Sequence, residues 1–281
     1  MSTDVIPEDF GTKERPEVML DFDPSVDGFS FPNMFAWTDE DLNQLVRELR
    51  PLMRLASFVV PTVVGNTLGR RPGLLAGMIA GGLISTSAAP DRLLKSLAGR
   101  WSTFGLCGGM ALRAKQAWLE KGGARTNTLG RDEIRADLRK AQSETIRASW
   151  AQFLRYWLEA RFLSLMRQPV HPDPELLAVE MQKIQRQLDR GIPSLLGLVG
   201  DTPDPFATHQ VVVFGLTQSL EKATLHVYDP NCPGRTMHIW VRRDDEGASI
   251  STDMSAGPKK SGGYHISKAA GTISMLFTID L

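Results

Sequence analysis

Cys107 is the residue whose type and setting best suit covalent chemistry, because it stands in FGLCGGM at the start of a predicted helix. The first turn of a helix offers unpaired N–H groups and the positive end of the helix dipole, and both stabilise a thiolate. The thiolate is the nucleophilic form of cysteine. The neighbouring glycines Gly105, Gly108 and Gly109 are predicted to let a substrate backbone come close. A small buried cysteine that only packs is the competing interpretation.

A histidine and an aspartate in the second half of the chain supply the groups that such a nucleophile needs. His209 opens the strand-like segment HQVVVFG, and Asp229 closes the next strand-like segment, in YDPN. In an antiparallel hairpin the start of one strand lies beside the end of the next. We therefore expect His209 and Asp229 to be neighbours, as a base and the group that orients it. Asn231 is a second candidate for the orienting role, and a surface histidine is the competing interpretation.

The order of these residues resembles the papain-like cysteine peptidases. The segments HQVVVFG and LHVYDPNCPG look most like bacteriocin-processing (double-glycine leader) peptidases and their standalone relatives, and the similarity covers roughly residues 100 to 245. The resemblance implies a papain-like α+β fold, a peptide or protein substrate and no cofactor. It also implies that Cys107 attacks a carbonyl carbon to form an acyl-enzyme, that His209 protonates the leaving amine, and that Asp229 holds the imidazole in the right tautomer.

One departure from the papain-like pattern concerns the oxyanion. These enzymes place a glutamine about six residues before the cysteine, and here Trp101 occupies that position. The oxyanion would then need the backbone N–H of Cys107 and a second donor. The candidates for the second donor are Ser102, Thr103 and Asn33.

Two alternative functions remain open for this sequence. An acyltransferase or a glutamine deamidase could use the same three residues. Because the glutamine of papain-like peptidases is absent before Cys107, these two activities stay as alternatives to peptide hydrolysis. A non-catalytic toxin or binding module is the other alternative, in which the apolar residues 52–98 engage a partner or a membrane.

Composition restricts the partners that the chain can have. Its 281 residues include 32 Lys and Arg and 32 Asp and Glu, so the formal net charge is zero. A nucleic-acid partner is therefore not expected, because binding phosphates requires an excess of basic residues. Two cysteines cannot build a disulfide framework, and Cys232, in the turn PNCPG, is interpreted as a bystander. No Cys and His residues have the spacing of a zinc site, so no metal is predicted.

The elements that must position the three residues are helical first and β-rich second, which indicates an α+β fold. Predicted helices follow the cap Thr38, follow Cys107 as far as Gly122–Gly123, cover residues 131–167, and run from the cap Asp173 to Gly191. Predicted strands are residues 192–199, 209–216, 223–230, 236–243 and a last strand in 271–281.

The chain is predicted to have two parts. Residues 1–98 form an N-terminal arm, extended to about residue 28, and a helical extension, whereas residues 99–281 form the catalytic domain with a flexible loop at 247–265. Residues 52–98 are interpreted as buried helices, with a membrane-inserting hairpin as the alternative, since neither apolar half reaches the roughly 20 residues of a membrane span. The acidic, proline-containing start lacks the features of a signal peptide. We therefore expect the protein in the cytoplasm, or exported by a route that needs no Sec signal.

Overall fold

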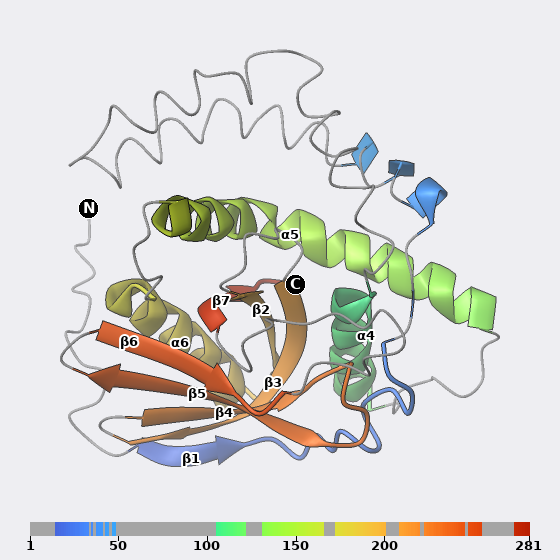
Figure 1. The fold of residues 1–281 in the computed structure, drawn as a ribbon. Helices are drawn as coiled ribbons and strands as arrows, with labels where there is room; N and C mark the ends of the chain where they lie inside the picture. Colours follow the sequence, from blue (N-terminus) through green and yellow to red (C-terminus); the bar gives the residue numbers. More distant parts are fainter. Residues whose placement is uncertain are drawn as a thin grey trace, which may run out of the picture.

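The computed structural model describes residues 15–33, 35, 38–41, 43–44, 47–48, 105–121, 131–165, 172–200, 208–219, 222–244, 247–254 and 273–281. These residues form an α+β structure in which helices pack against a seven-stranded antiparallel sheet (Figure 1). The α+β class predicted from the sequence is therefore confirmed.

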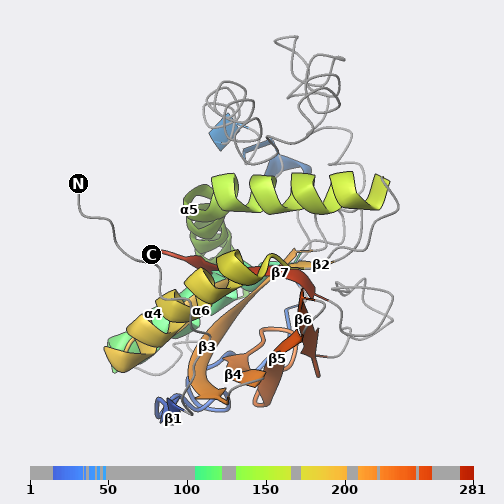
Figure 2. The same ribbon diagram turned by 90° about the vertical axis from the view of Figure 1, so that its left-hand side faces the viewer.

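The sheet is built around the long strand β3. Its strands are β1 (Arg15–Met19), β2 (Ser194–Gly200), β3 (Thr208–Gln218), β4 (Lys222–Tyr228), β5 (Thr236–Asp244), β6 (Gly247–Thr252) and β7 (Ile273–Ile279). The order is β6-β5-β4-β3-β2-β7, and β1 pairs with Gly215–Gln218 of β3, after the residues of β3 that pair with β2. The register between β3 and β4 shifts between Val213 and Gly215, and Figure 2 shows β3 as a long, bent strand. Strands β6 and β7 also contact each other, so the sheet curves back on itself.

In the described residues, three helices cover the sheet: α4 (Cys107–Leu119), α5 (Arg131–Leu165) and α6 (Pro174–Asp189). Because successive strand residues point to opposite faces, the strands β2, β3, β4 and β7 each contribute to two cores. Val211 and Val213 of β3 pack in the core that contains α6, while Val212 and Phe214 pack in the core that contains α4 and α5. Strands β2 and β7 are buried at every residue. Apolar runs of this kind are typical of strands covered on both faces.

Two parts of the sheet differ from the sequence predictions. The interpretation of residues 247–265 as a flexible loop is wrong for its first part, which is β6. Ala248 and Ile250 point into the core, each 3% exposed, and alternate with exposed serines, so the alternation is present but carried by small residues. The extended arm predicted for residues 1–28 contains β1, which pairs with β3. Residues 255–265 lie outside the described residues.

The helix predictions are confirmed in type, and one end is displaced. The side chain of Asp173 accepts hydrogen bonds from the N–H groups of Glu175 and Leu176 at the start of α6, and Gly191 follows its end with a φ of 71°. Helix α5 is one continuous helix. Helix α4 ends at Leu119, before the predicted glycines, because Lys121 itself adopts a left-handed φ of 53°.

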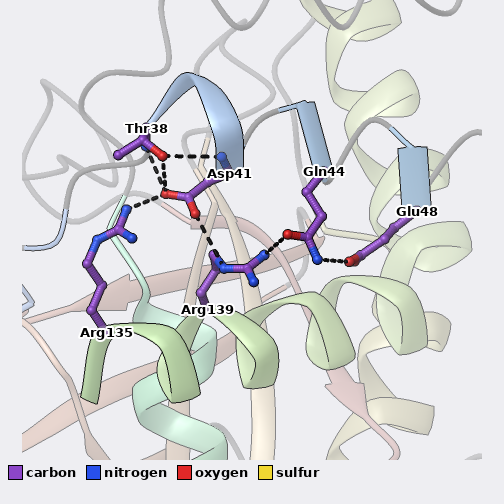
Figure 3. Close-up of polar contacts among 6 residues, drawn as sticks. All are labelled: Thr38, Asp41, Gln44, Glu48, Arg135 and Arg139. Atoms are coloured by element: carbon purple, nitrogen blue, oxygen red, sulfur yellow. Dashed lines mark hydrogen bonds and ion pairs between the residues drawn. The ribbon is translucent and has the colours of Figure 1, made fainter. Parts of the chain in front are cut away.

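A short helical stretch after Thr38 lies against α5 (Figure 3). Thr38 caps it as predicted: its hydroxyl accepts the N–H of Asp41, whose carboxylate accepts the N–H and hydroxyl of Thr38. The same carboxylate binds Arg135 and Arg139 of α5, and Arg139 donates to Gln44 at 2.6 Å. One buried carboxylate therefore both caps this stretch and joins it to α5.

The two-part division of the chain stays a prediction, since its boundary at residue 98 falls outside the described residues. Residues 52–98, with their predicted buried helices, also lie outside them. In the described parts of the chain, no helix combines the length and apolar character needed to cross a membrane.

Candidate active site

Cys107 is the first residue of α4 and carries a free, half-buried thiol. No side chain caps this helix end. The first turn is held by the N–H of Gly109, which donates to Gln142 of α5 at 3.0 Å, and by the N–H of Leu106, which donates to Asn33 at 2.8 Å. The cysteine is thus where the sequence predicted it, at the positive end of a helix fixed by two other segments.

His209 and Asp229 are neighbours, as the hairpin argument predicts. His209 is the second residue of β3, Asp229 follows the last residue of β4, and these two strands pair antiparallel. Their side chains meet with 2.6 Å between Nε2 and Oδ1, and each is 1% exposed. At this burial the interaction is little weakened by water.

Asn231, the second orienting candidate, lies beside the same pair. Its backbone N–H donates to Oδ1 of Asp229 at 2.8 Å, and its amide nitrogen is 3.5 Å from Nε2 of His209. Asp229 is therefore the closer partner of the ring, and Asn231 helps to fix the aspartate. Cys232 is buried, and its backbone N–H donates to the backbone oxygen of Asp229, so it belongs to this turn.

Electrostatics keep the His209 ring positively charged. Burial alone lowers its pKa, but the charge of Asp229 and its hydrogen bond outweigh that effect, and a hydrogen bond with Cys107 adds to them. Together they raise the pKa of His209 from 6.5 to about 10. Because Nε2 faces Asp229, the ring's other nitrogen, Nδ1, remains for the sulfur of Cys107. The three predicted residues thus interact as one group, in which an imidazolium can donate a proton.

Comparison of the chain with protein-family models, curated proteins and solved structures finds no match. The chemistry of the site therefore follows from the positions of its own residues. In the described part of the chain, no group of three or more His, Cys, Asp and Glu side chains is placed to share a metal ion.

Asn33 lies at the site, where its side-chain oxygen and its backbone N–H bond to the chain itself, and its role as an oxyanion donor stays a prediction. Its side-chain oxygen accepts the N–H of Leu106, and its own backbone N–H donates to Pro230 at 2.9 Å. Asn33 therefore connects the residue before Cys107 with the residue after Asp229. The other candidates, Ser102 and Thr103, and Trp101 lie outside the described residues.

The three glycines near Cys107 lie against atoms of the chain itself, which explains their small size without a substrate. A methyl group at each would meet another side chain or the backbone within 2.1 Å: Asn33 at Gly105, Gln210 at Gly108 and the backbone oxygen of Leu138 at Gly109. Their predicted role in substrate approach stays a prediction.

Gln210 is a site neighbour that the sequence analysis missed. Its side-chain oxygen is buried without a hydrogen-bond partner and lies where a side chain at Gly108 would be, so it packs between β3 and the start of α4. A polar residue between His209 and the valines that follow it is the signal that could have identified Gln210.

Proposed function

We propose that this chain is a cysteine peptidase with a papain-like fold that hydrolyses an amide bond through Cys107, His209 and Asp229. The observation that carries the proposal is the buried His209–Asp229 pair, which lies near enough to Cys107, at the start of α4, for that side chain to help raise the pKa of His209. Three residues from three elements converge here in the arrangement that activates a thiol. A nucleophile on a helix and a His–Asp pair on an antiparallel sheet also support the papain-like fold.

Acylation follows from these positions. The sulfur of Cys107 attacks the scissile carbonyl carbon, and the carbonyl oxygen becomes an oxyanion. As the oxyanion collapses, the carbon–nitrogen bond breaks, His209 gives its proton to the nitrogen, and the amine leaves. The product is a thioester with Cys107. Asp229 keeps the ring oriented and stabilises its positive charge before the proton is transferred.

Deacylation reverses the role of the histidine. A water molecule attacks the thioester carbon while neutral His209 accepts one of its protons. The carbon–sulfur bond then breaks, the carboxylic acid leaves, and Cys107 returns as a thiolate beside the imidazolium. The proposed steps use side chains of this chain and water.

A thiol-specific probe tests the activated cysteine without knowledge of the substrate. Iodoacetamide should alkylate Cys107 at about pH 6 at least tenfold faster than it alkylates glutathione, because the positive end of α4 and the charged ring of His209 both favour the nucleophilic form of the sulfur. Peptide mass spectrometry separates Cys107 from Cys232, and Cys107→Ala is the control. A wild-type rate no greater than that of glutathione would contradict the proposal.

A peptide library then separates hydrolysis from the alternatives on the same residues. Mass spectrometry should show two shorter products from a cleaved peptide, and Cys107→Ala should form neither. A gain of about one dalton without cleavage would indicate glutamine deamidation, since an amide becomes an acid. A mass gain equal to an acyl group would indicate acyl transfer, and either result would replace peptidase activity as the function.

A further inference from the structure

Residues 20–33, which we call the strap, connect helix α4 with the sheet beside the site. The N–H of Leu20 donates to the backbone oxygen of Phe214 at 2.9 Å. Phe22 is 3% exposed and its ring lies 5.3 Å from Phe214, 6.0 Å from Tyr228 and 6.5 Å from Trp118. One buried aromatic ring thus contacts β3, β4 and α4 together, so the strap is anchored on all the elements that carry the three residues.

The strap also holds both neighbours of Asp229. The N–H of Phe29 donates to the hydroxyl of Tyr228 at 3.0 Å, and the N–H of Asn33 donates to Pro230 at 2.9 Å. Gly28 lies so close to the Tyr228 ring that a methyl group there would be 2.5 Å from Cε2. Because Tyr228 and Pro230 flank Asp229 in the chain, these contacts fix the backbone that carries the aspartate.

The same strap holds the residues before Cys107. The side-chain oxygen of Asn33 accepts the N–H of Leu106 at 2.8 Å. A methyl group at Gly105 would lie 2.0 Å from the amide nitrogen of Asn33, so only glycine lets the two segments approach this closely. Asn33 is 9% exposed, which protects the link from competing water.

We propose that the strap is part of the catalytic apparatus and that Asn33 is its positioning residue, which fixes Cys107 relative to the His209–Asp229 pair. The inference rests on the function proposed above. Cysteine and aspartate belong to different elements, α4 and the end of β4, and Asn33 bonds to the residue next to each. Reacting groups must be held to within about 0.5 Å, so loss of such a link weakens the Cys107–His209 contact without removing either side chain.

Asn33→Leu tests the link, because leucine has a similar volume but cannot accept the Leu106 N–H. The rate of Cys107 alkylation by iodoacetamide is measured from about pH 5 to pH 9. In this reaction the sulfur–carbon bond forms as the carbon–iodine bond breaks and iodide leaves. We expect at least a tenfold lower rate at pH 6 and a much smaller difference at pH 9, where thiolate forms without a partner.

Two further variants separate positioning from general damage. Asn33→Asp keeps an oxygen that accepts the Leu106 N–H, so it should retain most of the reactivity at pH 6. Asn43→Leu makes the same exchange at an exposed helical position and should behave as wild type. If Asn33→Leu does not fold by near-ultraviolet circular dichroism, Gly105→Ala displaces the same contact from its other side and should give the same change in pH profile.

The outcomes distinguish this inference from the proposed function. If wild-type Cys107 reacts no faster than glutathione at pH 6, the proposed function fails, and the inference fails with it. If the wild type is fast and a folded Asn33→Leu or Gly105→Ala protein keeps its pH profile, the strap is not a positioning element, although the cysteine is still activated. Equal losses at pH 6 and pH 9 would indicate reduced access to Cys107 and would also overturn the inference.

Discussion

At the scale of single residues, two His–Asp pairs in this protein differ mainly in burial. His209 and Asp229 are each 1% exposed, whereas His238 and Asp253, at 2.8 Å, have side chains 31% and 35% exposed. Water and salt weaken the exposed pair, so its contribution to stability is small. Water does not screen the charges of the buried pair, so this pair should make the larger contribution to the pH dependence of folding stability.

The raised pKa of His209 sets the sign of that dependence. Its value of about 10 in the folded protein exceeds the value of 6.5 for the free side chain. The folded protein therefore holds a proton that the unfolded chain releases, and the resulting stability, complete below pH 6.5, is lost as the pH rises through 10. One pKa unit corresponds to about 1.4 kcal/mol. Between pH 6.5 and 10, urea titrations should show a decrease of several kcal/mol at most in the free energy of unfolding.

Asp229→Asn should remove most of this pH dependence, because burial then favours the neutral ring. Asp253→Asn removes the carboxylate of the exposed pair and is the matched control, which should keep the wild-type slope. Equal slopes in wild type and Asp229→Asn would show that Asp229 is not the source of the raised pKa of His209.

The sequence could identify Cys107, His209 and Asp229 because the chemistry of each is tied to its position in a helix or strand. A cysteine before a helix and a His–Asp pair across a hairpin need only local structure and one strand pairing. The contacts of Asn33 could not be predicted, because its neighbours Leu106 and Pro230 are 73 and 197 positions away, and only the packing of the strap brings them together.

At the scale of elements, the position of Cys107 depends on how closely α4 approaches α5. A methyl group at Gly109 would lie 2.1 Å from the backbone oxygen of Leu138, so glycine is what allows the two helices to touch. The N–H of Gly109 donates to Gln142 of α5 across the same contact. A side chain here must move the first turn of α4, and Cys107 with it.

Gly109→Ala should therefore lower stability by about 1 to 3 kcal/mol, as is usual for overpacking, and should slow Cys107 alkylation at pH 6. Gly191→Ala is the matched control. Gly191 has a left-handed φ of 71° but no atom within 4 Å of an added methyl group, so its cost of about 1 kcal/mol is confined to the backbone. It should leave alkylation unchanged. If Gly109→Ala kept the stability and the Cys107 reactivity of the wild type, helix α4 would be able to accommodate the methyl group without displacing Cys107.

Helices and strands could be predicted where the pattern of apolar residues along the chain was strong and uninterrupted. The segment 131–165 has no Gly or Pro to interrupt its helix, and β3 and β4 carry alternating or continuous apolar residues. Strand β6 was missed because Ala248 and Ile250 are its only apolar residues, and strand β1 because its pairing with β3 is not encoded locally. Both strands gain their stability from neighbours far away in the sequence.

At the scale of the whole molecule, a substitution of Asp41 tests whether folding stability can be lowered without changing the reactivity of Cys107. Asp41 joins the N-terminal helical stretch to Arg135 and Arg139 of α5, as Figure 3 shows. Burial raises the pKa of Asp41, but the hydrogen bonds from Thr38 and Arg135 outweigh it and hold that pKa below its usual value of 3.8. The stability from this charge is present above pH 3.8 and is lost as the pH falls through the lower value of the folded protein.

Asp41→Asn should reduce the free energy of unfolding at pH 7 by about 1.5 to 3 kcal/mol, the range for a hydrogen bond to a charged group. The difference from wild type should shrink as the pH falls below 3.8. Asp39→Asn, at an exposed position in the same helical stretch, should change stability little. Neither variant alters a contact of the strap, so both should retain the wild-type pH profile of Cys107 alkylation. Loss of that profile in folded Asp41→Asn would mean that the docking of this stretch on α5 also positions the cysteine, and that the strap does not act alone.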